Sequence, residues 1–255
     1  EGLARIETLL AHPKVIAVGE IGIDFFRDHS PHDVQVDAFV AQLRLAQAHS
    51  LPVIVHCRDA WDALDQTLAP WALEAAPGYA GKPLGVLHYY SSDLETAQRY
   101  AALGFLISVH TSLTHPKAQA LRDVAVALPL DTLVIETDSP YGAPQAYRGK
   151  RNQPAYVLEA ATKLAELRGE SLEAIATATT ANARRLFRLD SRRDAALAPS
   201  DGVYRRVGTS IHEARCRVEA SWTDLKVRPY SLTACLYARM RGRGGGGRGY
   251  SVRRR

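Results

Sequence analysis

The sequence has few cysteines and no long apolar segment. Its 255 residues include only three cysteines, Cys57, Cys216 and Cys235, which are far apart. An odd, scattered set forms neither a disulfide framework nor a zinc ligand set, so we expect a reducing compartment, the cytoplasm, with the nucleus or an organelle as alternatives. The sequence shows no charged-then-apolar leader and no apolar run of ~18 residues, so we expect neither a secretory signal nor a membrane span.

Acidic residues are scarce relative to basic ones only in the C-terminal part of the chain, residues 190–255. The net charge is +5, but residues 190–255 hold 15 Lys and Arg against 6 Asp and Glu, whereas residues 1–189 hold 17 against 21. The basic character therefore belongs to the tail and does not indicate that the globular part binds nucleic acid. Residues 190–255 have no hydrophobic period and end in an Arg/Gly-rich run, so we expect disorder. This tail is either an RNA-contacting segment or a dispensable extension, and we favour the second interpretation.

Residues 1–189 alternate between short apolar runs and segments with helical periodicity. The apolar runs show no polar alternation, which is typical of a parallel sheet covered by helices and predicts an α/β fold. Ser171 and Gly169 are expected to cap the start of one helix and the end of another. We expect strands at 15–18, 52–56, 84–88, 105–109 and 133–137, and helices at 1–10, 31–46, 60–74, 94–103, 116–128, 154–168 and 172–189.

Four of the expected strands are followed or ended by a residue type that binds metals. These residues are Glu20, His56, His88 and Asp138, separated by 36, 32 and 50 residues. The first two gaps each match one strand–helix repeat, and the last spans two repeats. Carboxyl ends of parallel strands lie on one face of an α/β fold, where ligands bind. A single residue of this kind is more often structural. Four such residues, each at the carboxyl end of a strand and spaced by whole strand–helix repeats, predict a metal site at the mouth of a barrel.

Two imidazoles and two carboxylates suit Zn²⁺, Mn²⁺, Fe²⁺ or Co²⁺, and also Mg²⁺ when water and substrate oxygens complete the shell. Such a site can hold two ions, which lower the pKa of a bound water and clamp the oxygens of an in-line displacement. We expect Asp138 both to hold a metal and to accept the proton of the attacking water. Glu136, two residues earlier, is expected to orient a ligand.

A Pro/Gly-rich loop with a basic cluster follows Asp138. Arg148, Lys150 and Arg151, together with Asn152, are candidates for binding the phosphate groups of an anionic substrate, because guanidinium and ammonium groups carry most phosphate affinity. The alternative is a solvated loop. Arg58, two residues past His56, either holds a phosphate or forms an ion pair with Asp59 or another neighbour. His110 also ends an expected strand, but the residues after it give no support for a site, so we interpret it as structural.

Five motifs stand in order along the chain: Gly19–Asp24, Leu51–Arg58, Glu136–Tyr141, Arg148–Pro154 and Thr180–Phe187. They resemble motifs of the TatD family of metal-dependent deoxyribonucleases. The resemblance covers about residues 13–189, and the motifs occur in order with fitting spacing. It implies a TIM-type (β/α) barrel, a divalent-metal site and hydrolysis of DNA phosphodiesters, often as a 3′→5′ exonuclease. Glu20 would then bridge two ions (Mg²⁺, Mn²⁺ or Zn²⁺), His56 and His88 would hold one of them, and Asp138 would hold the other and serve in catalysis.

The chain departs from the family pattern in four respects. It has no His-x-His pair, and the family-like region is shorter than the ~250 residues of a typical barrel. We therefore expect an incomplete barrel over residues 1–189, with the first one or two βα units missing upstream, and a separate disordered tail over 190–255. The usual His-Cys-Phe-Ser-Gly motif is here His88-Tyr89-Tyr90-Ser91-Ser92. Gly142 replaces a larger apolar residue.

Two other functions stay open at this point. One is an amidohydrolase that cleaves a C–N or ester bond in a small molecule, although the basic loop after Asp138 argues against it. The other is an inactive barrel fragment whose Arg/Gly tail binds RNA, which the missing His-x-His pair supports.

Overall fold

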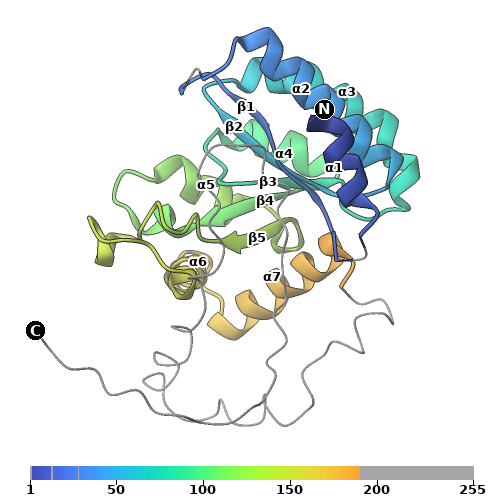
Figure 1. Ribbon diagram of the computed structural model, residues 1–255. Coiled ribbons are helices and arrows are strands. Elements are labelled where there is room, and N and C mark those ends of the chain that lie inside the picture. Colours follow the sequence, from blue (N-terminus) through green and yellow to red (C-terminus); the bar gives the residue numbers. More distant parts are fainter. Residues whose placement is uncertain (1, 13, 28, 190–255) are drawn as a thin grey trace, which may run out of the picture.

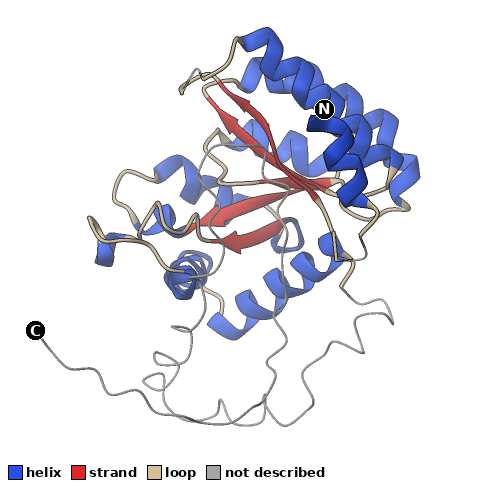
Figure 2. Ribbon diagram, in the orientation of Figure 1, coloured by secondary structure: helices blue, strands red, loops and turns tan. Residues whose placement is uncertain are grey.

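The computed structural model describes residues 2–12, 14–27 and 29–189 of the protein. The predicted disorder and RNA contacts of residues 190–255 lie outside the described residues. The structure is an α/β fold with one five-stranded sheet, which confirms the predicted class (Figures 1 and 2). No helix in the described ranges has the length and apolar character needed to cross a bilayer.

All five strands are parallel, and their order in the sheet is their order in the chain. Parallel neighbours need a crossover connection, and a helix supplies most of each one here. This arrangement brings the carboxyl ends of consecutive strands to the same edge. The strands are β1 (Val18–Asp24), β2 (Val53–Arg58), β3 (Gly85–Leu87), β4 (Phe105–His110) and β5 (Leu133–Glu136).

Within the described residues seven α-helices lie around the sheet, with α1, α2 and α3 grouped beside β1 and β2 and α6 and α7 near β5 (Figure 1). Two predicted caps are confirmed. Gly169 ends α6 in the left-handed conformation, and Ser171 begins α7 by accepting a hydrogen bond from the Ala174 N–H at 3.1 Å. The helices are α1 (Gly2–Leu10), α2 (His32–Ala48), α3 (Trp61–Ala75), α4 (Leu94–Ala102), α5 (Gln119–Ala127), α6 (Val157–Arg168) and α7 (Leu172–Phe187), with short 3₁₀ segments η1 (Ala76–Tyr79), η2 (Thr111–Thr114), η3 (Leu130–Thr132), η4 (Gln145–Tyr147) and η5 (Pro154–Tyr156).

The two faces of the sheet are chemically different. Side chains alternate between faces along a strand, and in β2 Val53, Val55 and Cys57 are buried in the main core, whereas Ile54, His56 and Arg58 are partly exposed. The sequence suggested uniformly apolar strands, and this expectation was wrong for the second face of the sheet. Their second face is apolar near the amino ends of the strands and polar near the carboxyl ends.

Helix α7 covers the apolar part of this second face. Its residues Ala183, Leu186 and Phe187 pack with side chains from four neighbouring strands. The buried side chain of Asn182 fixes the helix by donating hydrogen bonds to the carbonyls of Leu130 and Leu133 at 2.8 and 2.7 Å. The polar part of the face, toward the carboxyl ends, is left for the functional site. The strand residues that α7 contacts are Ile54, Val86, Leu106 and Val134.

The predicted first strand was misplaced. It was expected at residues 15–18, but β1 runs from Val18 to Asp24, so Glu20 lies within the strand and Asp24 ends it. The glycine-rich run can pair because its glycines permit close approach to β2. Gly22, opposite His56, has φ +143°, and a Cβ there would lie 1.9 Å from the His56 carbonyl oxygen. Only glycine fits this position without moving β2.

We predict that Gly22→Ala lowers the free energy of unfolding by at least about 2 kcal/mol, because it adds a backbone clash to an unfavourable φ. The measurement is chemical denaturation followed by circular dichroism. Gly78→Ala is the matched control, since a Cβ there meets nothing within 4 Å and the backbone is not in the positive-φ region. Equal stability of Gly22→Ala and Gly78→Ala would contradict the close contact at Gly22.

His110 is a core residue, in agreement with its structural interpretation. It is 4% exposed, its Nε2 lies 3.1 Å from the Tyr90 carbonyl oxygen, and its ring stacks on Tyr89 with centroids 3.7 Å apart. Burial lowers the pKa of His110 to about 4, although the hydrogen bond to Tyr90 opposes the shift. The ring is therefore neutral in the folded protein at physiological pH.

This buried neutral ring predicts an acid sensitivity. The pKa of His110 is lower in the folded state than the ordinary 6.5, so the unfolded state takes up the proton first and stability falls between about pH 6.5 and 4. We expect the free energy of unfolding of the wild type to fall by about 2–3 kcal/mol more than that of His110→Gln between pH 7 and pH 4. Denaturant titrations at several pH values test this, and parallel pH profiles for the two proteins would refute it.

Candidate functional site

The Glu20 carboxylate lies between the two predicted histidine ligands. Its Oε1 atom is 3.4 Å from His56 Nδ1 and 3.2 Å from His88 Nε2. Glu20 projects from β1 on the polar face, His56 projects from β2, and His88 directly follows β3. Three neighbouring strands thus bring together side chains that are 68 residues apart at the extremes.

A second carboxylate orients each imidazole. His56 Nε2 lies 3.3 Å from Asp24 Oδ2, and His88 Nδ1 lies 2.8 Å from Glu136 Oε2. Each ring therefore turns one nitrogen toward an orienting acid and the other toward Glu20. Carboxylate–imidazole pairs of this kind fix the ring and the tautomer of metal-binding histidines. The predicted supporting role of Glu136 agrees with this position, where its Oε1 also accepts the Tyr89 N–H at 2.6 Å.

Asp24 is the residue that the sequence reasoning did not assign. Its Oδ1 accepts hydrogen bonds from the backbone N–H groups of Phe26 at 3.0 Å and Arg27 at 2.9 Å, which holds the carboxylate toward His56. The available signal was its place at the end of the Gly-x-x-Gly-x-Asp run, Gly19–Asp24. That signal was not used because the strand was expected to end before this residue.

Asp138 completes the acidic side of the site from the loop after β5. Its Oδ1 lies 3.9 Å from His88 Nε2, and its side chain is 41% exposed. Burial raises the pKa of Asp138, His88 lowers it, and the nearby Glu20 and Glu136 carboxylates raise it, with a net upward shift. A carboxylate with a raised pKa and partial exposure is suited to accepting a proton from bound water.

The histidines and acids perturb one another strongly. Burial disfavours the charged form of His88, but the hydrogen bond and charge of Glu136, with Glu20 and Asp138, raise the pKa of His88 to about 9. Burial also opposes the charge on Glu20 and Glu136, but contacts with the imidazoles more than offset it, so the pKa of each carboxyl is lowered. Titratable side chains with shifted pKa values that lie close together are typical of functional sites.

The donor atoms present fit a divalent cation. Ligand atoms about 2.1 Å from one ion lie about 3.0–3.4 Å from each other, and the Glu20–His56 and Glu20–His88 distances fall in this range. Over residues 2–12, 14–27 and 29–189, however, no three His, Cys, Asp or Glu side chains already form a complete metal cluster. Closure around an ion therefore requires these side chains to shift.

The basic loop is held by hydrogen bonds within the loop and by contacts with the residues that follow β4. Asn152 is 2% exposed, and its amide donates to the carbonyls of Tyr141 at 2.6 Å and Gly142 at 3.2 Å. The Thr111 hydroxyl also donates to the Gly142 carbonyl, and His115 Nε2 lies 2.8 Å from the Ala143 carbonyl oxygen. The structure gives Asn152 a bracing role inside the loop. The three predicted cations, Arg148, Lys150 and Arg151, are exposed on its surface.

Arg58 does not form the predicted alternative ion pair with Asp59. Its guanidinium carbon lies 3.6 Å from the centre of the Phe26 ring, and in the part of the chain that the structure describes no carboxylate lies within ion-pair distance of it. Arg58 is on the same face of β2 as His56 and opposite Asp24 of β1. Its charge is therefore available at the rim of the site.

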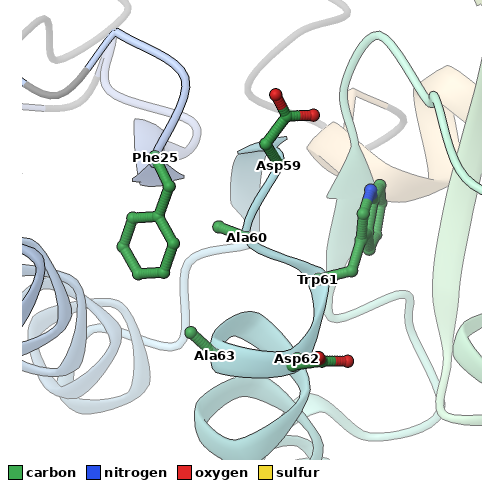
Figure 3. Close-up of a pocket in the computed structure, with 6 residues that line it drawn as sticks. All are labelled: Phe25, Asp59, Ala60, Trp61, Asp62 and Ala63. Carbon is green, nitrogen blue, oxygen red and sulfur yellow. The ribbon is translucent and has the colours of Figure 1, made fainter.

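A small open pocket of about 200 Å³ adjoins this rim. Figure 3 shows Phe25 and Trp61 on either side of the turn that carries Ala60, with the Asp59 and Asp62 carboxylates nearby. Two acidic side chains in so small a pocket disfavour a phosphate. The pocket therefore does not replace the polar face of the sheet as the candidate site.

We predict that Asp24→Asn weakens divalent-metal binding by about 10- to 100-fold, because an amide orients His56 less strongly than a carboxylate. Asparagine keeps the Oδ1 acceptor for the two backbone N–H groups, so the turn should persist. Isothermal titration of the purified chain with Mn²⁺ or Zn²⁺ measures the effect, with Asp37→Asn on the exposed side of α2 as the control. The same dissociation constant for Asp24→Asn and wild type would rule out the orienting role.

Comparisons with known proteins agree with this geometry. A family model described as "TatD related DNase" matches residues 1–188. The chain is 39% identical over 190 residues to "Uncharacterized metal-dependent hydrolase YabD" of Bacillus subtilis, covering 74% of this chain and 72% of that protein. It is 38% identical over 195 residues to "3'-5' ssDNA/RNA exonuclease TatD" of Rahnella sp., with 74% and 72% covered.

A solved structure is also similar. The crystal structure of YJJV, a TatD homologue from Escherichia coli K12, superposes with a TM-score of 0.66 at 36% identity, covering 73% of this chain and 70% of that one. The family match spans most of the chain, and the relatives are covered over more than two thirds of their length. This protein therefore belongs to the TatD-related DNase family of metal-dependent hydrolases.

Proposed function

We propose that this protein is a divalent-metal-dependent hydrolase of DNA phosphodiester bonds that acts as a 3′→5′ exonuclease. The observation that carries the proposal is the convergence of two carboxylate-backed imidazoles on Glu20, with Asp138 beside them. Relatives at about 38% identity bear the name 3′-5′ ssDNA/RNA exonuclease, which supports a nucleic-acid substrate.

Glu20, His56, His88 and Asp138 are the residues that would hold the metal, and we propose two ions of Mg²⁺, Mn²⁺ or Zn²⁺, with Glu20 shared between them. When bound, these ions supply Lewis acidity, which activates water and stabilises charge on the phosphate. Asp24 and Glu136 keep the two imidazoles turned toward Glu20. The polypeptide thus supplies a preoriented donor set rather than the nucleophile itself.

Asp138 is the proposed general base. Its pKa is raised, so it holds a proton more readily than an ordinary aspartate, and its partial exposure gives water access to it.

Substrate binding is assigned to the cations at the rim. Arg58 lies beside β1, and Arg148, Lys150 and Arg151 lie on the loop after β5, so positive groups are placed at both ends of the sheet. They offset the negative charge of the Glu20, Asp24, Glu136 and Asp138 cluster, which by itself would repel a phosphate. Asn152 acts indirectly, by holding the loop that carries three of these cations.

We further propose that residues 1–189 form one hydrolase unit, an incomplete barrel of the TIM type. The sequential parallel strand order, the covering helices and the similarity to YJJV support this architecture. In such barrels the site is built from the carboxyl ends of the strands, as here.

We predict EDTA-sensitive shortening of single-stranded DNA by the purified chain in Mg²⁺ or Mn²⁺. A 5′-labelled oligonucleotide should yield a ladder of shortened products, and a 3′-labelled one should release labelled mononucleotide first. Asp138→Asn should lower kcat by about 10²- to 10⁴-fold, because it removes the proton acceptor. Denaturing gels and single-turnover kinetics measure both effects.

Asp37→Asn serves as the control and should keep full activity. If neither Mg²⁺ nor Mn²⁺ gives EDTA-sensitive shortening, the nuclease proposal is wrong. Metal-dependent cleavage of a small amide or ester without cleavage of DNA would indicate an amidohydrolase instead.

A further inference from the structure

We propose that Phe26 and Arg58 form a stacking platform for an unpaired base of single-stranded nucleic acid at the rim of the site. The inference rests on the proposed nuclease function and goes beyond it by identifying the part of the substrate that this rim receives. Phe26 lies in the turn after β1, and Arg58 is the last residue of β2.

A direct contact between Arg58 and Phe26 defines the platform. The Arg58 guanidinium lies over the Phe26 ring, with its central carbon 3.6 Å from the ring centre, while Phe26 keeps 58% of its surface exposed. Stacking of this kind fixes the plane of a guanidinium and leaves its N–H edges directed outward. The opposite face of the ring or of the guanidinium can then take a further flat group.

The platform adjoins the metal-ligand cluster. Arg58 pairs in register with Asp24, and it follows His56 by two residues on the same face of β2. Asp24 in turn contacts His56 and binds the Phe26 N–H. A nucleotide whose base lies on Phe26 or Arg58 would therefore have its phosphates near Glu20 and His56.

Other exposed apolar side chains lack this arrangement. Leu73 on α3 is 70% exposed, and such isolated surface residues are ordinary in soluble proteins. Phe26 differs because it is aromatic, carries a stacked cation and lies beside the functional site. In the described ranges no acid neutralises that cation, so it can bind a phosphate.

A nucleotide is the ligand that fits both parts, because a base offers a flat π-face and its phosphate offers an anion. In a duplex both faces of a base are covered by its stacked neighbours. The platform therefore favours single strands and unpaired 3′ ends. The nearby pocket, lined by Asp59 and Asp62, is a poorer place for the phosphate.

Binding measured in EDTA separates this inference from catalysis. We expect fluorescence anisotropy to show that the wild type binds a short labelled oligothymidylate at low salt at least about fivefold more tightly than an abasic chain of equal length. Phe26→Leu should remove this preference by weakening oligothymidylate binding about fivefold or more. A fivefold loss corresponds to the lower end of the range of affinities lost with one stacked base. Phe26→Tyr should keep it, and binding of the abasic chain should not change.

Leu73→Ala is the matched control and should leave both affinities unchanged. The inference is overturned if the wild type does not distinguish the two chains, or if Phe26→Leu binds both as the wild type does, whether or not the protein cleaves DNA. A base preference that depends on Phe26, found together with no EDTA-sensitive cleavage, would support the platform and reject the nuclease function. The two proposals can therefore fail independently.

Discussion

Parallel strands send alternate side chains to opposite faces of the sheet, and the site of this protein depends on that constraint. Five consecutive strands align their carboxyl ends at one edge, so Glu20, His56, His88 and Glu136 reach the same region from four different strands or strand ends. Helix α7 covers the apolar half of that face and leaves the polar half open. Function and core packing thus share one sheet surface, divided along the strand direction.

The charge balance of the site follows from this crowding. Burial and the nearby Glu20 and Glu136 carboxylates raise the pKa of Asp138. Burial disfavours the charged form of His88, but its contact with Glu136 and the charges of Glu20 and Asp138 raise the pKa of His88 to about 9. Such a cluster is costly without a cation. Hydrogen bonds from backbone N–H groups to Asp24 and Glu136 offset part of this cost by holding two of the acids in place. The arrangement suits a site that gains stability when a divalent ion binds.

Two departures from the family motifs are linked in space. Tyr89 stands where the family motif has a cysteine, and Gly142 stands where a larger apolar residue is usual. A Cβ at Gly142 would lie 2.7 Å from the Tyr89 hydroxyl oxygen, and that hydroxyl also lies 2.8 Å from Ser112 Oγ. The larger side chain at 89 therefore requires the smaller one at 142.

The sequence by itself determined the α/β class, most of the elements, the family and the four candidate ligands, because hydrophobic periodicity and residue types at strand ends are local features. It misplaced β1, because the approach of Gly22 to the His56 carbonyl, which lets a glycine-rich run pair as a strand, is not a local feature. Only the tertiary structure gave Asp24 its partner, buried Asn152 inside the loop and paired Arg58 with Phe26 rather than Asp59. The contacts of Asp24 and Arg58 join residues on different strands or turns, and Asn152 contacts residues that come 10 and 11 positions earlier in its own loop. None of these distances can be read from local sequence, because they depend on how the chain packs.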